Sequence, residues 1–456
     1  MRMSVAEAAM AVGGKWETDV VFSSVCTDSR KLKPGCLFVA VEGENFDGHA
    51  FIRAAEEQGA AAVLCHKRVK SGLPVILVKN TQTALLRLAA YYRGKFDIPV
   101  VGLTGSVGKT TTKDMTACVL ASRYHTLKTQ GNFNNEIGLP LTVFQMDETT
   151  QAAVLEMGMS NFGEISRLSQ AAAPTLGIIT KIGVSHMETL GSQEGILKAK
   201  LELLDGLKPG APLLLNGDDP FLKDIAYANR PVLFFGMENQ ACDFRAENIE
   251  QGEDSTRFVL CYKGKRYPVT LPTIGLHNVY DALAAFGAGV TLGVPPEAAA
   301  KALSQYLPSG MRQRVVRCEG LTVIEDCYNA SPDSVKAALT ALGEMPCKGR
   351  RVAVLGDMLE LGGISEEAHL SCGMQAAKSA DLLFTFGPLA SGYAKGARKA
   401  GMQAVWEFDG GAGKGPLIDA LLEALQDGDA VLFKASRGMK LEEAIAPLYE
   451  RWKKQC

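Results

Sequence analysis

A glycine-rich turn after a short apolar stretch carries the strongest chemical signal in the sequence. Residues 100–112 read VVGLTGSVGKTTT, which predicts a strand, a tight turn and the start of a helix. Backbone N–H groups in such a turn point at an anion, and the helix N-terminus adds partial positive charge. Lys109 can reach the β- and γ-phosphates of a nucleotide, and the Thr110 hydroxyl can bind Mg²⁺. ATP or GTP is therefore expected to bind to Gly105, Ser106, Val107, Gly108, Lys109, Thr110 and Thr111.

The turn departs from the common phosphate-loop pattern G-x-x-x-x-G-K-[ST], because Leu103 stands where the first glycine is expected. An ordinary connection between a strand and a helix is the alternative interpretation. The preceding strand, Gly105 and the three consecutive threonines argue against it. A second glycine-rich stretch, residues 410–415, lacks a hydroxyl after its lysine and is interpreted as a flexible loop.

Composition limits the classes of protein that need to be considered. A chain of 456 residues predicts roughly three domains at about 150 residues each. A net charge of −2 gives no broad attraction to nucleic acid or to anionic lipid. No apolar run approaches the roughly 20 residues of a membrane span. The eleven cysteines form no CxxC pair, which indicates reduced thiols, a cytoplasmic location and no zinc site.

The pattern of apolar runs predicts an α/β protein of three domains: a small N-terminal α/β domain (1–97), a central phosphate-loop domain (98–307) and a C-terminal Rossmann-like domain (308–456). In the first domain we expect a helix within residues 1–16, strands at 36–41 and 74–78, and helices at 49–58 and 81–94. Pro99 disfavours helix in the residue before it and marks the first boundary.

Short apolar strands then alternate with helices, which predicts a doubly wound, mostly parallel sheet. In the central domain we expect strands at 100–103, 152–157, 176–180, 212–215 and 232–235, then a hairpin at 257–271 and a helix at 279–290. The last domain repeats the alternation with strands at 321–326, 351–355, 382–386, 405–408 and 430–433. We expect the third domain to move on the second about residues 308–310.

Seven further motifs make the chain similar to the Mur ligases, the ATP-dependent amino-acid ligases of peptidoglycan synthesis. These motifs are QGNFNNEIGLP at 130–140, LEMGMS at 155–160, ITKIGVSH at 179–186, GLHN at 275–278, DCYN at 326–329, LGDMLELG at 355–362 and KASRGM at 434–439. Within the family, the chain most resembles the members that add D-alanyl-D-alanine to UDP-MurNAc-tripeptide. The resemblance implies amide-bond formation through an acyl phosphate, giving UDP-MurNAc-pentapeptide, ADP and phosphate. It also implies ATP and Mg²⁺ as cofactors; we expect a monomer with no nucleic-acid partner.

The resemblance assigns catalytic roles to Lys109, Glu156, His186 and Lys200. Glu156, expected at the end of a buried strand, would hold Mg²⁺ together with Thr110. His186, expected at the end of another strand, would reach a second Mg²⁺ near Lys200. Lys200 matches a lysine that relatives carry as a carbamate, with Lys198 as its rival for that register.

The resemblance also assigns binding residues in all three domains. Asn278 would contact adenine, and Arg312 and Asp326 would approach ATP from the third domain; helix capping and a surface salt bridge are the alternatives. The substrate-binding residues implied are Ser29, Arg30 and Asn45 for the uridine nucleotide, Asn134, Asn135, Glu136 and Ser160 for the rest of that substrate, and Asn329 and Ser334 for the dipeptide. Asn and Ser also favour turns and caps, which is the competing explanation for the last pair.

Four positions depart from the family pattern: Lys181, Leu276, Ser331 and Glu325 stand where Asn, Arg, Asn and Asp are usual. Lys181 would place an ammonium group near the expected metal site or on a phosphate. Because of these departures, one alternative interpretation is that the chain is a nucleotide-regulated binding protein with an inactive site. A sister ligase that adds a single amino acid is a second alternative, and a Rossmann oxidoreductase is disfavoured because no G-x-G-x-x-G follows a strand.

Overall fold

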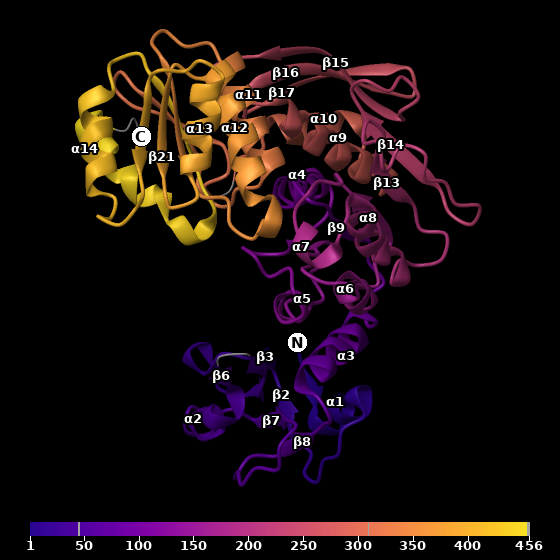
Figure 1. Ribbon diagram of the computed structural model, residues 1–456. Helices are drawn as coiled ribbons and strands as arrows, with labels where there is room; N and C mark the ends of the chain where they lie inside the picture. The colour runs from indigo at the N-terminus through magenta and orange to yellow at the C-terminus, as the bar shows by residue number, and fades with distance from the viewer. Residues whose placement is uncertain (44–45, 309, 454–456) are drawn as a thin grey trace.

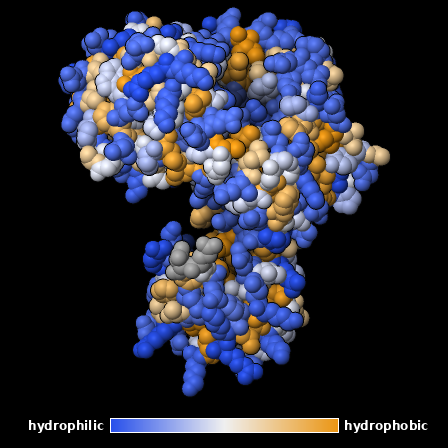
Figure 2. Space-filling view, viewed as in Figure 1, coloured by the Kyte–Doolittle hydropathy of each residue, from blue (hydrophilic) through white to orange (hydrophobic). Residues whose placement is uncertain are grey.

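The computed structural model describes residues 1–43, 46–308 and 310–453 and contains three α/β units, each with its own sheet. Figure 1 shows the N-terminal unit at one end of the molecule, joined through helix α3 to a central unit that packs beside the C-terminal one. The surface is mainly hydrophilic, and the molecule narrows where the first unit joins the rest (Figure 2). Asn45 lies outside the described residues, as does Ser309 in the expected hinge.

The N-terminal unit is built on a parallel sheet of order β3-β4-β7-β8. Its strands and helices are β1 (Met3–Ser4), α1 (Val5–Val12), β2 (Val21–Phe22), β3 (Ser24–Cys26), β4 (Cys36–Val39), β5 (Glu42–Gly43), β6 (Phe46–Asp47), α2 (Ile52–Glu57), β7 (Ala62–Cys65), β8 (Val75–Leu77) and α3 (Thr81–Arg93). The Ser4 hydroxyl accepts from the Glu7 N–H and starts α1, whereas Gly13 in a left-handed conformation ends it. The helix expected at 49–58 begins instead with a 3₁₀ turn, Gly48–Phe51.

The central unit contains a nine-stranded sheet of order β10-β11-β9-β12-β13-β14-β15-β16-β17, parallel from β10 to β15. Its strands are β9 (Val100–Thr104), β10 (Thr126–Lys128), β11 (Ala152–Glu156), β12 (Leu176–Ile179), β13 (Leu213–Asn216), β14 (Val232–Gly236), β15 (Phe244–Gln251), β16 (Thr256–Tyr262) and β17 (Lys265–Leu271). Its helices are α4 (Lys109–Ala121), α5 (Gly138–Val143), α6 (Glu164–Ala172), α7 (Met187–Leu190), α8 (Gln193–Leu201), α9 (Leu276–Thr291) and α10 (Pro296–Ser304). The predicted hairpin turns at Lys263 and Gly264, both with positive φ.

The two faces of the central sheet are covered by different helices, which explains why its strands are apolar throughout. Helices α4, α9 and α10 bury one face, and α5, α6 and α8 bury the other. All five residues of β9 and of β11 are buried. Because both strands end at the same edge of the sheet, the turns that follow them lie together there.

The C-terminal unit is a second doubly wound sheet, of order β18-β19-β23-β20-β21-β22. Its elements are β18 (Arg314–Arg317), β19 (Thr322–Asp326), α11 (Pro332–Glu344), β20 (Arg351–Gly356), α12 (Ser365–Ser379), β21 (Leu382–Phe386), α13 (Ser391–Lys399), β22 (Val405–Phe408), α14 (Gly415–Ala424), β23 (Ala430–Lys434) and α15 (Ala446–Arg451). Only the pairing of β18 with β19 is antiparallel. The α/β class and the expected alternation of strands and helices are confirmed. The glycine-rich stretch at 410–415 is a loop that leads into α14.

The first and central units share one hydrophobic core across the predicted boundary at residue 97. Helix α3 packs against α1 on one side and against α5 and α6 on the other. Each sheet lies within one predicted domain range, but the boundaries themselves stay predictions, because α3 belongs to both cores. In the described part of the chain, no helix is long and apolar enough to cross a membrane.

Arg93, at the end of α3, is almost completely buried and fixes this joint. Its guanidinium donates to the carbonyls of Ala172 at 3.0 Å and Phe96 at 2.5 Å, and at longer range to those of Ile98 and Ala173. One rigid group therefore satisfies carbonyls from the connecting segment and from the end of α6.

Replacing Arg93 should loosen the joint between the first two units. Arg93→Ala leaves several buried carbonyls without a donor, so we expect the free energy of unfolding to fall by about 3 kcal/mol. Urea unfolding followed by circular dichroism would measure the change. Arg87→Ala, on the exposed side of the same helix, is the matched control and should cost about 0.5 kcal/mol or less. Equal losses for both variants would contradict the role given to Arg93.

Candidate functional site

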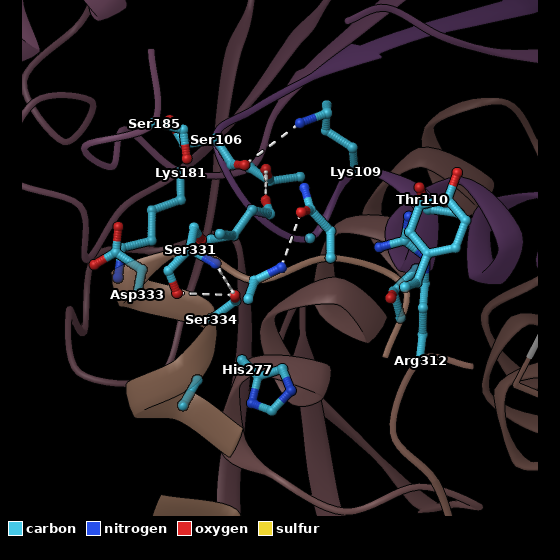
Figure 3. Close-up of a pocket in the computed structure, with 18 of the residues that line it drawn as sticks. Ser106, Lys109, Thr110, Lys181, Ser185, His277, Arg312, Ser331, Asp333 and Ser334 are labelled. Atoms are coloured by element: carbon cyan, nitrogen blue, oxygen red, sulfur yellow. Dashed lines mark hydrogen bonds between the residues drawn. The ribbon is translucent and has the colours of Figure 1, made fainter. Parts of the chain in front are cut away.

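A cavity of about 630 Å³ lies between the central and C-terminal units, at the carboxyl ends of β9, β11 and β12. Figure 3 shows that side chains from both units point into it. The predicted phosphate-loop residues Ser106 to Thr111 line one wall. The opposite wall is formed by residues that follow β19, by the start of α11 and by the segment after β23.

The phosphate loop has the conformation that the sequence predicts. Gly108 adopts a left-handed conformation (φ +83°) directly before α4, and a Cβ built at Gly105 would collide with the side chain of Thr180. The Lys109 ammonium donates to the Gly105 carbonyl at 2.8 Å and to the Ser106 carbonyl at 3.4 Å. Burial lowers the pKa of Lys109. The ammonium therefore lies over the loop, where the oxygens of a bound phosphate would accept its hydrogen bonds.

Asp281 lies beneath the loop and was missed by sequence reasoning. Its Oδ1 accepts from the Thr112 hydroxyl at 2.7 Å and would be 2.5 Å from a Cβ on Gly108. Burial raises the pKa of this carboxyl group to about 7. Asp281 stands one helical turn after His277, so the i, i+4 spacing could have identified it.

Glu156 ends β11, as predicted, and is almost completely buried. Its Oε1 accepts from the Asn134 amide at 2.9 Å, and its Oε2 has no hydrogen-bond partner. The buried Lys113 ammonium lies 4.0 Å from Oε2. A carboxylate oxygen that accepts no hydrogen bond, in the cavity that Thr110 and the phosphate loop also line, fits Mg²⁺. This ion is commonly held by one or two carboxylates and by substrate phosphates. Among the described residues, no cluster of three His, Cys, Asp or Glu side chains could hold a metal ion alone.

His186 does not end a strand, so that expectation was wrong. Strand β12 ends at Ile179, and His186 follows it in a connecting segment as the left-handed N-cap of α7 (φ 65°). Its side chain nevertheless lines the cavity. Burial, together with Lys109 and Lys200, lowers the pKa of His186 to about 4, so the imidazole is neutral near pH 7.

Lys200 and Lys198 differ sharply in their surroundings. Lys200 is 2% exposed, whereas Lys198 is on the exposed side of α8 with its ammonium over the ring of Phe162. Burial and the charge of Lys109 lower the pKa of Lys200 well below its usual value. Across residues 1–43, 46–308 and 310–453, no carboxylate lies within 4 Å of the Lys200 ammonium to offset this effect.

The C-terminal unit contributes Arg312, Asp326 and Asn329 to the cavity. The Arg312 guanidinium lies 3.9 Å from the centre of the Tyr328 ring (Figure 3 labels Arg312 beside the loop residue Thr110). Asp326 accepts from the buried Lys434 ammonium at 2.7 Å, and the same ammonium donates to the Asn329 carbonyl at 3.1 Å. Asp326 is therefore in a buried ion pair rather than a surface salt bridge.

Asn278 lies inside the first turn of α9 rather than before the helix, and Gly275 is the N-cap. The side-chain amide of Asn278 donates to Gln313 Oε1 at 2.7 Å, and His277 Nε2 lies 2.6 Å from the same oxygen. Burial lowers the pKa of His277 to about 4. Gln313, which sequence reasoning missed, thus joins the start of α9 to the C-terminal unit.

Several residues assigned to substrate binding lie outside this cavity. Ser29 and Arg30 form a 3₁₀ turn in the N-terminal unit, where Arg30 pairs with Asp28. Asn135 caps the start of α5 by accepting from the N–H groups of residues 137 and 138. Glu136 pairs with Arg167 and accepts from Gln82.

Two of the assigned serines make local contacts. Ser160 binds Glu164 through its N–H and Thr189 through its carbonyl, outside the cavity. Ser334 lines the cavity but also completes a capping box with Ser331 at the start of α11. The substrate-binding roles of both serines stay predictions.

The four residues that depart from the family pattern differ in their position relative to the cavity. Lys181 and Ser331 line it, and the Lys181 carbonyl accepts from the Ser106 N–H at 2.9 Å. Glu325 accepts from the Tyr449 hydroxyl at 2.5 Å and pairs with Arg314, on the side of β19 opposite Asp326. Leu276 begins α9 and is 37% exposed.

Comparison with known proteins finds matches to one family in three segments of the chain. Residues 21–93, 103–289 and 311–437 match the family descriptions "Mur ligase family, catalytic domain", "Mur ligase middle domain" and "Mur ligase, glutamate ligase domain". The chain is 45% identical to the UDP-N-acetylmuramoyl-tripeptide--D-alanyl-D-alanine ligase of Bacillus subtilis over 94% of both chains.

Solved structures are similar over the full length as well. The structure of MurF from Acinetobacter baumannii has a TM-score of 0.91 at 30% identity, with 99% of both chains covered. That of the MurF ligase from Thermotoga maritima in complex with ADP has a TM-score of 0.84 at 30% identity and covers 94% of this chain and 97% of that one.

The carboxyl group of Asp281 should make nucleotide binding depend on pH. Below its pKa of about 7 the group is neutral, and above it a negative charge beneath the loop opposes the phosphates. We expect the affinity for Mg-ADP to fall by up to about tenfold between about pH 6 and about pH 8. Asp281→Asn should lack this part of the change, because an amide does not titrate. Titration calorimetry on both proteins measures the affinity at each pH, and the ionisation of ADP itself cancels when the two proteins are compared. Parallel curves of affinity against pH would contradict the assignment.

Proposed function

The chain belongs to the Mur ligase family, and we propose that it joins D-alanyl-D-alanine to UDP-MurNAc-tripeptide at the expense of ATP. The product is UDP-MurNAc-pentapeptide, a peptidoglycan precursor. The observation that carries the proposal is the phosphate loop facing C-terminal residues across one cavity, in a chain that is similar over its full length to ligases of this name.

The reaction divides into two steps. A carboxylate of the tripeptide attacks the γ-phosphorus of ATP, the bond to the β-phosphate oxygen breaks, and ADP leaves. The amine of the dipeptide then attacks the acyl carbon, loses a proton and displaces phosphate. The protein forms no covalent bond in either step, so it acts by placing the reactants and by neutralising charge.

The residues at the loop offset negative charge in the first step. The Lys109 ammonium and the loop N–H groups would face the transferring phosphoryl group, and Arg312 lines the same cavity from the C-terminal unit. Thr110 and Glu156 would hold Mg²⁺, which neutralises phosphate charge when bound. The neutral His186 imidazole offers a further electron pair in the same cavity.

Lys200 is the residue that we assign to the carbamate. Its pKa is lowered, so the amine loses its proton more readily than an exposed lysine and can then attack CO₂ with release of a proton. The carbamate replaces a positive charge with oxygen acceptors that would orient a metal site. Lys198 is exposed and lacks this environment.

The proposed substrates also indicate where the protein works. ATP and a UDP-linked precursor are cytoplasmic metabolites, which supports a cytoplasmic location. The balanced net charge of −2 supports a protein without a nucleic-acid partner. The monomeric state and the movement of the C-terminal unit stay predictions.

Phosphate release from Mg-ATP tests the proposed function. We expect release only when UDP-MurNAc-tripeptide and D-alanyl-D-alanine are both present, with a pentapeptide product identified by mass spectrometry. Lys109→Ala should lower kcat by about a hundredfold or more. Turnover with a single amino acid instead of the dipeptide would identify a sister ligase. Nucleotide binding without turnover would instead identify a regulated binding protein.

Isotopically labelled bicarbonate tests the carbamate. We expect a carbamate carbon signal by NMR in the wild type and in Lys198→Ala, and none in Lys200→Ala. Lys200→Ala should also lose most of its activity, whereas Lys198→Ala should retain it. A signal that persists in Lys200→Ala would place the carbamate elsewhere.

A further inference from the structure

Asp333 is a half-buried carboxylate in the cavity, and within the described residues no ion pair at 4 Å or less offsets its charge. It is the second residue of α11, and its side chain points into the cavity near Ser331 and Ser334 (Figure 3). Its Oδ2 is buried and has no hydrogen-bond partner. Burying such an oxygen without a donor is costly, so the site is incomplete without a ligand that donates.

The position of Asp333 brings this oxygen across the cavity to the phosphate loop. A Cβ built at Gly183 would collide with Asp333 Oδ2 and lie 3.1 Å from the Cβ of Ser106. The Gly183 N–H donates to the Ser106 hydroxyl at 2.9 Å, which ties this segment to the loop. A residue of the C-terminal unit therefore places a carboxylate directly beside the site of phosphoryl transfer.

A carboxylate at that place would repel an acyl phosphate unless a cation lies between them. Lys181 lines the same cavity, but within the described ranges its ammonium forms no direct ion pair with Asp333 at 4 Å or less. The dipeptide carries an ammonium group, which must come close to the acyl carbon for the second step. Its charge and its donor groups match the unpartnered Oδ2.

We propose that Asp333 binds the amino group of the incoming dipeptide and holds it beside the phosphate loop. This inference rests on the proposed function and adds the contact that selects a substrate with a free amine. Asp333 also lies in the first turn of α11, where an acidic residue favours the helix dipole. The test must therefore separate ligand binding from helix stability.

Steady-state kinetics and an analogue without the amine make that separation. Asp333→Asn keeps the size of the side chain and removes its charge. We expect the KM for D-alanyl-D-alanine to rise about tenfold or more, with the KM values of ATP and UDP-MurNAc-tripeptide within about twofold of wild type. N-propionyl-D-alanine, which lacks the amino group, should inhibit the wild type and Asp333→Asn equally. Glu366→Gln, an exposed first-turn acid of α12, is the matched control and should change none of these constants.

Two results would overturn the inference: an unchanged KM for the dipeptide, or equal weakening of dipeptide and analogue. If Asp333→Asn does not fold, the wild type alone still provides a test, because it must bind the dipeptide about tenfold more tightly than the analogue. A wild type that never uses the dipeptide would contradict the proposed function itself. A wild type that uses it, with an Asp333→Asn variant that is equally efficient, would contradict only the role of Asp333.

Discussion

Buried charge that the protein itself pairs only incompletely is the constraint on which the rest of the site depends. In the parts of the chain described, the hydrogen bonds of Lys109 go to backbone carbonyls and Lys200 has no carboxylate within 4 Å. One oxygen of Glu156 accepts no hydrogen bond and has the Lys113 ammonium at 4.0 Å. Such groups are costly to remove from water and are normally paired. Nucleotide phosphates would pair with Lys109, a divalent cation would bind Glu156, and CO₂ would convert Lys200 into the proposed carbamate. The fold thus holds in place groups whose partners arrive with the substrates.

The sheet explains how these groups are held. Strands β9 and β11 are buried along their whole length, so the loop after β9 and Glu156 at the end of β11 have little freedom to move. Helices α4 and α9 pack together over one face of the sheet, and the contact between Asp281 and Thr112 joins them. Rigid elements of one unit therefore fix the phosphate end of the site.

The C-terminal unit supplies the other wall through residues that follow its own strands. Asp326 ends β19, and its ion pair with Lys434 at the end of β23 fixes the segment that carries Asn329. Gln313 connects this unit to the start of α9. Since residues of both units line the cavity, contacts at this seam control how the two walls meet.

The sequence predicted most of the fold because the buried strands are continuous apolar runs bounded by turn residues. It missed β15, whose residues FRAENIEQ are largely polar, and it also missed the short strands β3, β7, β10 and β18. The phosphate loop and Glu156 were predictable from a local pattern. His186 was misplaced because the chain continues for several residues beyond β12 before reaching it. Gln313 and Asp333 lie against segments distant in the sequence, and no local pattern encodes such contacts.

The acyl phosphate is the central chemical claim, and oxygen transfer tests it most directly. The substrate would carry a heavy oxygen isotope in the tripeptide carboxylate that becomes the amide, and mass spectrometry would follow the released phosphate. The account predicts that each phosphate carries one labelled oxygen, because the bond between carbon and that oxygen breaks when the amine attacks. Unlabelled phosphate accompanied by amide formation would contradict the claim.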